Sequence, residues 1–187
     1  MIRRIVYTMN VSLDGFINSP SGSLEWANVD DEVHVWFNEE ARKAAAFVYG
    51  RRMYETMAAY WPTAESDPAA TPAMRDFAVI WNRTPKIVFS NSLVSVSGDS
   101  RLVRGGVGGE LARLNSEFDG ELQIGGADLA AQFIRAALVD EFGLVVHPVL
   151  LGGGTPFFPP GLLARELRLV ETKTFTNGAV HLRYRRA

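Results

Sequence analysis

The stretch QIGGADLAAQF, residues 123–133, places two glycines between an apolar strand and an apolar helix. Glycine gives up side-chain packing there and loses more backbone entropy on folding than any other residue. A Gly-Gly pair at such a junction indicates that something approaches the backbone closely, or that the backbone takes an unusual conformation. The elements on either side of the pair predict the fold that holds it.

Short apolar runs alternate with helical patterns along most of the chain. The runs that predict strands are residues 2–9, 46–49, 86–89, 122–124 and 141–151. Between them, apolar residues recur at spacings of three and four, which predicts helices. The first such series is Val33, Trp36, Phe37, Ala41 and Ala44, and a further helix is expected over residues 110–118. Asp30 or Asp31 is expected to cap the first helix, and Asp128 the helix that follows the glycine pair.

The C-terminal end has a different pattern. Residues 167–174 and 179–185 are expected to be strands, and they flank Asn177-Gly178, a strong signal for a tight hairpin. The basic residues of HLRYRR, 181–186, are expected on a solvated face. The order of elements predicts an α/β fold with three layers, α/β/α, and a mostly parallel central sheet that ends in an antiparallel hairpin. We expect one domain over residues 1–187.

The composition excludes several classes of function. The chain has 187 residues, a formal net charge of −2 and no cysteine, so nothing favours nucleic acid or a membrane surface as a partner, and thiolate catalysis is excluded. The three histidines have no metal-ligand spacing, and no metal site is expected. No run approaches the ~20 apolar residues that span a bilayer, and a cytoplasmic location is expected.

Three strand ends carry chemistry suited to a dinucleotide, and ligands of open α/β sheets bind outside the carboxyl ends of the strands. In YGRRMYE, Gly50 and Arg51 stand where a strand turns into a helix, a position that favours phosphate. Ser90, Asn91 and Ser92 follow the next strand and offer hydroxyl and amide groups. The Gly125-Gly126 pair would let backbone lie against a pyrophosphate. A Gly-x-Gly-x-x-Gly fingerprint is absent, which disfavours an ordinary Rossmann dehydrogenase.

These stretches resemble the dihydrofolate reductase-like superfamily. Within it, the chain is most similar to bacterial proteins related to the C-terminal reductase domain of the bifunctional riboflavin-biosynthesis deaminase/reductase. The motifs that carry the resemblance are VSLDGFI, YGRRMYE, KIVFSNSL, IGGADLAAQFI, LVDEF and HPVLLGGGTPFF. They occur in the family's order and span nearly the whole chain, which makes them far more specific together than singly.

The resemblance implies NADPH as the cofactor. It places the cofactor phosphates at Gly50, Arg51 and Arg52, and the adenosine 2′-phosphate side at Ser90, Asn91 and Ser92. The glycine pair is implied to lie against the pyrophosphate and nicotinamide, typically through a cis peptide. The remaining cofactor-binding residues that the resemblance implies are Asn10, Val11 and Ile17 beside the nicotinamide ring, and Ala127, Asp128 and Leu129 at the start of the following helix.

The substrate side is less defined by the sequence. Dihydrofolate reductases use a carboxylate near the start of the first helix, and the matching position here is Val33. Asp31 and Glu32, just before it, are the candidate catalytic carboxylates, although both also suit a helix N-terminus. Trp26 and Trp36 are the candidate walls of a flat substrate pocket, with Trp36 also a candidate for the core. These departures put reduction of dihydrofolate itself in doubt.

We therefore expect an NADPH-dependent reductase that transfers a hydride to a small pterin-like or pyrimidine-like heterocycle. One alternative is the 5-amino-6-(5-phosphoribosylamino)uracil reductase of riboflavin synthesis, although no lysine or arginine cluster for its ribosyl phosphate is evident. Another is a nucleotide-binding protein without catalysis. Many relatives pair, so a homodimer is a further expectation.

Overall fold

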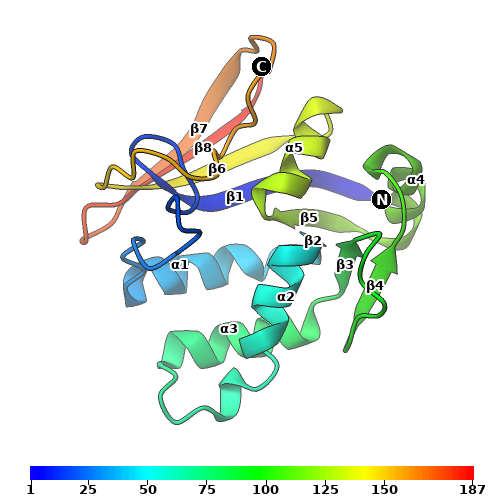
Figure 1. Ribbon diagram of the computed structural model, residues 1–187, viewed down its shortest axis with the longest axis horizontal. Coiled ribbons are helices and arrows are strands. Elements are labelled where there is room, and N and C mark those ends of the chain that lie inside the picture. The colour runs from blue at the N-terminus through cyan, green and yellow to red at the C-terminus, as the bar shows by residue number, and fades with distance from the viewer.

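The computed structural model describes residues 1–187 as one eight-stranded sheet with helices on both faces (Figure 1). The strands are β1 (Ile2–Ser12), β2 (Ala44–Gly50), β3 (Lys86–Phe89), β4 (Ser100–Val103), β5 (Gly120–Gly125), β6 (Glu141–His147), β7 (Leu167–Thr174) and β8 (Val180–Arg186). The helices are α1 (Asp31–Ala41), α2 (Arg51–Tyr60), α3 (Pro72–Arg83), α4 (Val107–Glu117) and α5 (Ala127–Arg135), with a short 3₁₀ turn at Ala64–Ser66. No helix combines the length and the apolar character needed to cross a membrane.

The strand order is β4-β3-β2-β5-β1-β6-β8-β7. All neighbours from β4 through β6 run parallel, and β8 pairs antiparallel with both β6 and β7. This confirms the predicted mostly parallel sheet and the antiparallel C-terminal hairpin. Crossovers through helices put the carboxyl ends of β3, β2, β5 and β1 side by side at one edge.

The two faces of the sheet have separate cores. On one face, Tyr7 and Leu122 pack with Phe133 of α5 and Leu114 of α4 in the largest apolar cluster. On the other, strands β2 and β3 pack with α2 and α3, while Trp36 of α1 packs with Phe175 and Val145 near the C-terminal hairpin. Helices α1, α2 and α3 thus cover one face and α4 and α5 the other, which confirms the three-layer prediction.

Several element boundaries differ from the sequence-based expectation. Strand β4 was not expected, and β6 ends at His147, before Pro148, which has no N–H to donate to a ladder. Helix α1 ends at Ala41, because Ala44 already begins β2. The N-cap of α5 is Gly126 and not Asp128. Asp30, in contrast, caps α1 by accepting a hydrogen bond from the Val33 N–H at 3.0 Å.

The C-terminal basic stretch is solvated only in part: Arg186 is exposed, but His181 and Arg183 are buried, contrary to expectation. His181 is 0% exposed and Arg183 8%. Both face α1 because their strand pairs with β6 in the register Val145–His181 and Gly143–Arg183. Arg183 is held there by carboxylates from α1, β6 and β7, so the charge is compensated inside the protein.

Candidate functional site

The three strand-to-helix junctions that the sequence singles out lie next to one another. Gly50 of β2 pairs with Phe89, the last residue of β3, and Tyr49 pairs with Gly125 of β5. A Cβ on Gly50 would stand 3.5 Å from the Leu129 Cβ, so the start of α5 lies directly against the start of α2. The turns at residues 50–52, 90–92 and 125–126 therefore share one edge of the sheet.

Three helices that begin at this edge have no side-chain cap at their N-termini. The N-cap residues of α2, α4 and α5 are Gly50, Gly106 and Gly126, and none provides a side-chain cap. Asp30 and Thr71, in contrast, cap α1 and α3 through their side chains. The first N–H groups of a helix need an acceptor. At this edge they are available to an anion, which the helix dipole also favours.

The glycine pair has two separate structural causes. A Cβ on Gly125 would lie 2.7 Å from Cε1 of Tyr49, closer than side chains approach in proteins. Gly126 has φ +93°, a conformation that residues with a Cβ rarely adopt. The expected cis peptide is absent, since every peptide bond in the chain is trans. Close packing at one glycine and a left-handed turn at the other explain the pair.

The serine turn after β3 is held by its own hydrogen bonds. The Ser90 Oγ accepts from the N–H groups of Ser92 and Leu93, and the Asn91 side chain accepts from the Gly105 N–H at 3.2 Å. Arg104, which follows β4, donates to the carbonyls of Ser90 and Leu93. Sequence reasoning missed Arg104 because it also missed β4, the strand that brings this arginine to the edge.

The remaining predicted cofactor residues divide into exposed and buried groups. Arg51 and Arg52 are exposed and form ion pairs with Glu55 at 2.9 Å and with Asp128 at 3.7 Å. Exposed pairs of this kind contribute little and exchange partners readily. The side chains that are buried in the larger core belong to Val11, Ile17, Ala127 and Leu129.

A cavity of about 310 Å³ opens beside this edge, between the sheet and helices α1, α2 and α3. Gly125 and Asn10, at the ends of β5 and β1, belong to its lining and connect it to the glycine turn. Its apolar wall consists mainly of Phe37, Phe47, Tyr49, Met53, Met57, Trp61 and Phe77. A concave apolar site with a few polar groups is the usual form of a small-molecule pocket.

The polar residues that line the cavity are Thr8, Asn10, His34, Glu40 and Gln123. Asn10 is held by His147, whose Nε2 lies 2.8 Å from the Asn10 Oδ1. Gln123 donates to the Glu40 carbonyl and to the Glu121 carboxylate, both at 2.7 Å. The centroid of the His34 ring lies 6.1 Å from that of Trp61 and 6.2 Å from that of Phe77. Burial lowers the pKa of the His34 imidazole.

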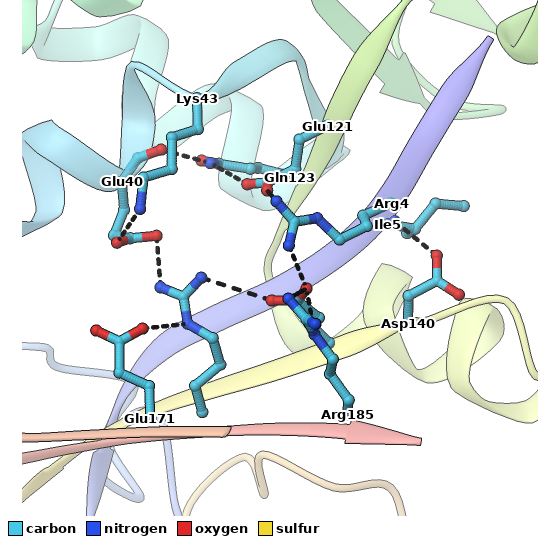
Figure 2. A network of polar contacts seen from close by, with 11 residues as sticks. Arg4, Ile5, Glu40, Lys43, Glu121, Gln123, Asp140, Glu171 and Arg185 are labelled. Carbon is cyan, nitrogen blue, oxygen red and sulfur yellow. Dashed lines mark hydrogen bonds and ion pairs between the residues drawn. The ribbon is translucent and has the colours of Figure 1, made fainter. Parts of the chain in front are cut away.

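Next to the cavity, the same face of the sheet carries a group of charged residues that we call the ion-pair network (Figure 2). Its members are Arg4, Glu40, Lys43, Glu121, Glu141, Glu171, Arg183 and Arg185. Glu141, 0% exposed, binds Arg4 at 2.7 Å and Arg185 at 2.8 Å. Burial would raise the pKa of Glu40, but hydrogen bonds from Lys43 and Arg183 outweigh it and hold that pKa below its usual range.

The residues predicted for catalysis and substrate binding lie outside the cavity lining. Asp31 is exposed, and Glu32 accepts hydrogen bonds from the N–H and Oγ1 of Thr176. Trp36 packs against His181 with ring centroids 4.3 Å apart. Trp26 stands edge-on to His147 at 5.7 Å. The aromatic residues at the cavity come instead from the other side of α1, from β2, from α3 and from Trp61, which follows α2.

The fold is that of the dihydrofolate reductase-like proteins. A dihydrofolate reductase from Enterococcus faecalis, solved with NADP(H) and RAB-propyl, superposes with a TM-score of 0.65 at 19% identity, over 98% of this chain and 96% of that one. A structure from Shewanella sp. PV-4, named "putative riboflavin biosynthesis protein", has a TM-score of 0.76 at 24% identity over 98% and 99% of the two chains. At these identities the likeness concerns the fold.

The sequence places the chain more narrowly. Residues 3–181 match the RibD C-terminal domain family, and the chain belongs to that family. It is also 30% identical to the uncharacterised protein YyaP of Bacillus subtilis over 183 residues, which cover 97% of this chain and 94% of YyaP.

Proposed function

We propose that the chain is an NADPH-dependent reductase that transfers a hydride to a small pterin-like or pyrimidine-like heterocycle. The observation that carries the proposal is that α2, α4 and α5 begin at glycines without side-chain caps along one edge of the sheet, and that an apolar cavity opens beside this edge at β5 and β1. Membership of the RibD C-terminal domain family and the fold shared with a dihydrofolate reductase support it.

The donors at the sheet edge fit a dinucleotide phosphate. Free N–H groups at the starts of α2 and α5, with Arg51 and Arg52, are suited to the pyrophosphate. At the neighbouring turn, the Ser90 hydroxyl and the Asn91 Nδ2 can donate to a further phosphate, and Arg104, which holds the turn, adds positive charge. When bound, the cofactor would supply the hydride.

The chain's own residues would orient the reactants and keep water away. Asn10, fixed by His147, stands where the edge meets the cavity and can hold a polar group there. The aromatic wall excludes water from a bound ring, which strengthens the few polar contacts inside. His34 is the only imidazole of the lining, and burial lowers its pKa and so favours the neutral ring.

The test is a fluorescence titration of the purified protein with NADPH and with NADH. NADPH is expected to bind more tightly than NADH, and Arg51→Ala to weaken NADPH binding about 10-fold, the effect of losing one charge-assisted hydrogen bond. Arg113→Ala is the matched control, since Arg113 makes the same i,i+4 pair with a glutamate, Glu117, on α4. If the protein binds neither NADPH nor NADH, the proposed function is wrong.

A further inference from the structure

The cavity has no cation with which to neutralise an anionic substrate. No lysine or arginine belongs to its lining, and the only charged side chain there is Glu40. Burying a phosphate or carboxylate in an apolar site without a partner is strongly unfavourable. The lining therefore selects against any ligand that carries its negative charge into the cavity.

The nearest cations are already engaged. Lys43 binds the Glu40 carboxylate at 2.6 Å, and Arg183 binds the same group at 2.6 Å. Arg183 also contacts Glu171 at 3.2 Å and Glu141 at 3.5 Å, so moving it toward a substrate would leave the buried Glu141 with less compensation. The ion-pair network thus prevents these charges from serving the cavity.

The neutral polar groups of the lining are also mostly fixed by the protein. Gln123 and Asn10 have hydrogen-bond partners within the chain. The His34 imidazole has none, and it stands beside the contacting rings of Trp61 and Phe77, which belong to the apolar wall. A half-buried imidazole without a partner is suited to exchange a hydrogen bond with a ring heteroatom of the ligand.

Accepting the function proposed above, we propose that the cavity takes an uncharged, unphosphorylated flat heterocycle and that His34 is the side chain that hydrogen-bonds its ring. The aromatic wall accounts for the flat ring, and Met53 and Met57 adapt to its outline. A volume of about 310 Å³ is at the small end of ligand pockets and fits a bicyclic ring without a long charged tail.

The test compares two fluorescent probes, pterin and pterin-6-carboxylate, which share a ring and differ by one anionic group. Each is titrated against the protein without nucleotide at pH 7.5. Pterin is expected to bind at least 10-fold more tightly than its carboxylate. His34→Phe keeps an aromatic ring but removes the hydrogen bond, so pterin binding should weaken about 3–10-fold. Val35→Ala, an exposed neighbour outside the lining, should leave it unchanged.

Adding a cation at the rim of the cavity also tests whether its absence excludes anionic ligands. Val29 lines the cavity and is 40% exposed, so Val29→Arg can be accommodated at the rim. This variant should improve binding of pterin-6-carboxylate about 10-fold, because the missing cation is then supplied. The separate NADPH titration distinguishes the two proposals. Equal or tighter binding of the carboxylate by the unmodified protein, or binding of neither probe where NADPH binds, overturns the substrate class and leaves the reductase proposal standing.

Discussion

The cavity and the ion-pair network occupy one face of the same sheet, and strand β1 passes through both. Its alternate residues lie on that face: Arg4 belongs to the network, while Val6, Thr8 and Asn10 line the cavity. In the network each buried charge has an opposite charge beside it, whereas the cavity leaves His34 free among aromatic rings. The network stabilises the fold and pairs the local charges, Glu40 included, so no lysine or arginine remains for a ligand in the cavity.

The largest expected effect comes from breaking the network at its buried centre. Glu141→Gln keeps the shape but removes the charge that compensates Arg4, Arg185 and Arg183. Removing one partner of a buried ion pair costs about 3–5 kcal/mol of unfolding free energy, to be measured by urea denaturation. Glu171→Gln is the control, since this carboxylate is 48% exposed and should contribute under about 1 kcal/mol. Equal losses in the two variants would contradict a buried network.

The next effect concerns pH. Burial, with the charge of Arg183 as the second cause, lowers the pKa of His181 from 6.5 to about 4; Lys43 and Lys173 also lower it, and Glu40 opposes them. The unfolded chain therefore binds a proton at this residue between pH 6.5 and 4 where the folded protein does not, so stability falls as the pH falls through that window. The loss attributable to His181 is about 3 kcal/mol at its full extent.

His181→Leu should remove that part of the acid sensitivity. Neither ring nitrogen of His181 has a hydrogen-bond partner, so the substitution leaves no group newly unsatisfied at pH 7.5. The measurement is the unfolding free energy from urea titrations at pH 7.5, 6 and 5. If the unfolding free energies of the unmodified protein and of His181→Leu fall by the same amount between pH 7.5 and 5, groups other than His181 cause the loss of stability in acid.

The smallest of these effects tests the junction between the cavity and the sheet edge. Gly125→Ala places a Cβ against the Tyr49 ring, and overpacking of this kind costs about 1–3 kcal/mol. Gly108→Ala on α4 has open space around its Cβ and should instead stabilise by about 0.5–1 kcal/mol. Thermal unfolding of both variants gives the comparison, and a neutral Gly125→Ala would remove close packing as the reason for that glycine.

The sequence predicted the sheet edge well and the cavity poorly, for a physical reason. The edge follows from chain order alone, because a glycine after a parallel strand must lie near the glycine after the neighbouring strand. The cavity depends on how α1 is rotated. Trp36 and Val33 form one apolar stripe and His34, Phe37 and Ala41 another, and periodicity does not say which stripe faces a ligand.

Other misses have the same tertiary origin. Trp61 and Phe77 reach the cavity from α2's end and from α3, which only the folded arrangement brings together. The basic residues of the C-terminal strand were predicted to face solvent, but Arg183 is paired with carboxylates on α1, β6 and β7. The members of each group are far apart in the sequence, so no local pattern predicts either the aromatic wall or the ion pairs of Arg183.

Under the proposed function, a dinucleotide lies on the starts of α2 and α5 with its reactive ring at the mouth of the cavity. A crystal structure of the protein with NADP⁺ is the decisive measurement. We expect phosphate oxygens within hydrogen-bond distance of the first N–H groups of α2 and α5, and the nicotinamide between Asn10 and Gly125. A nucleotide bound elsewhere, or one whose nicotinamide lies away from the cavity, would contradict it.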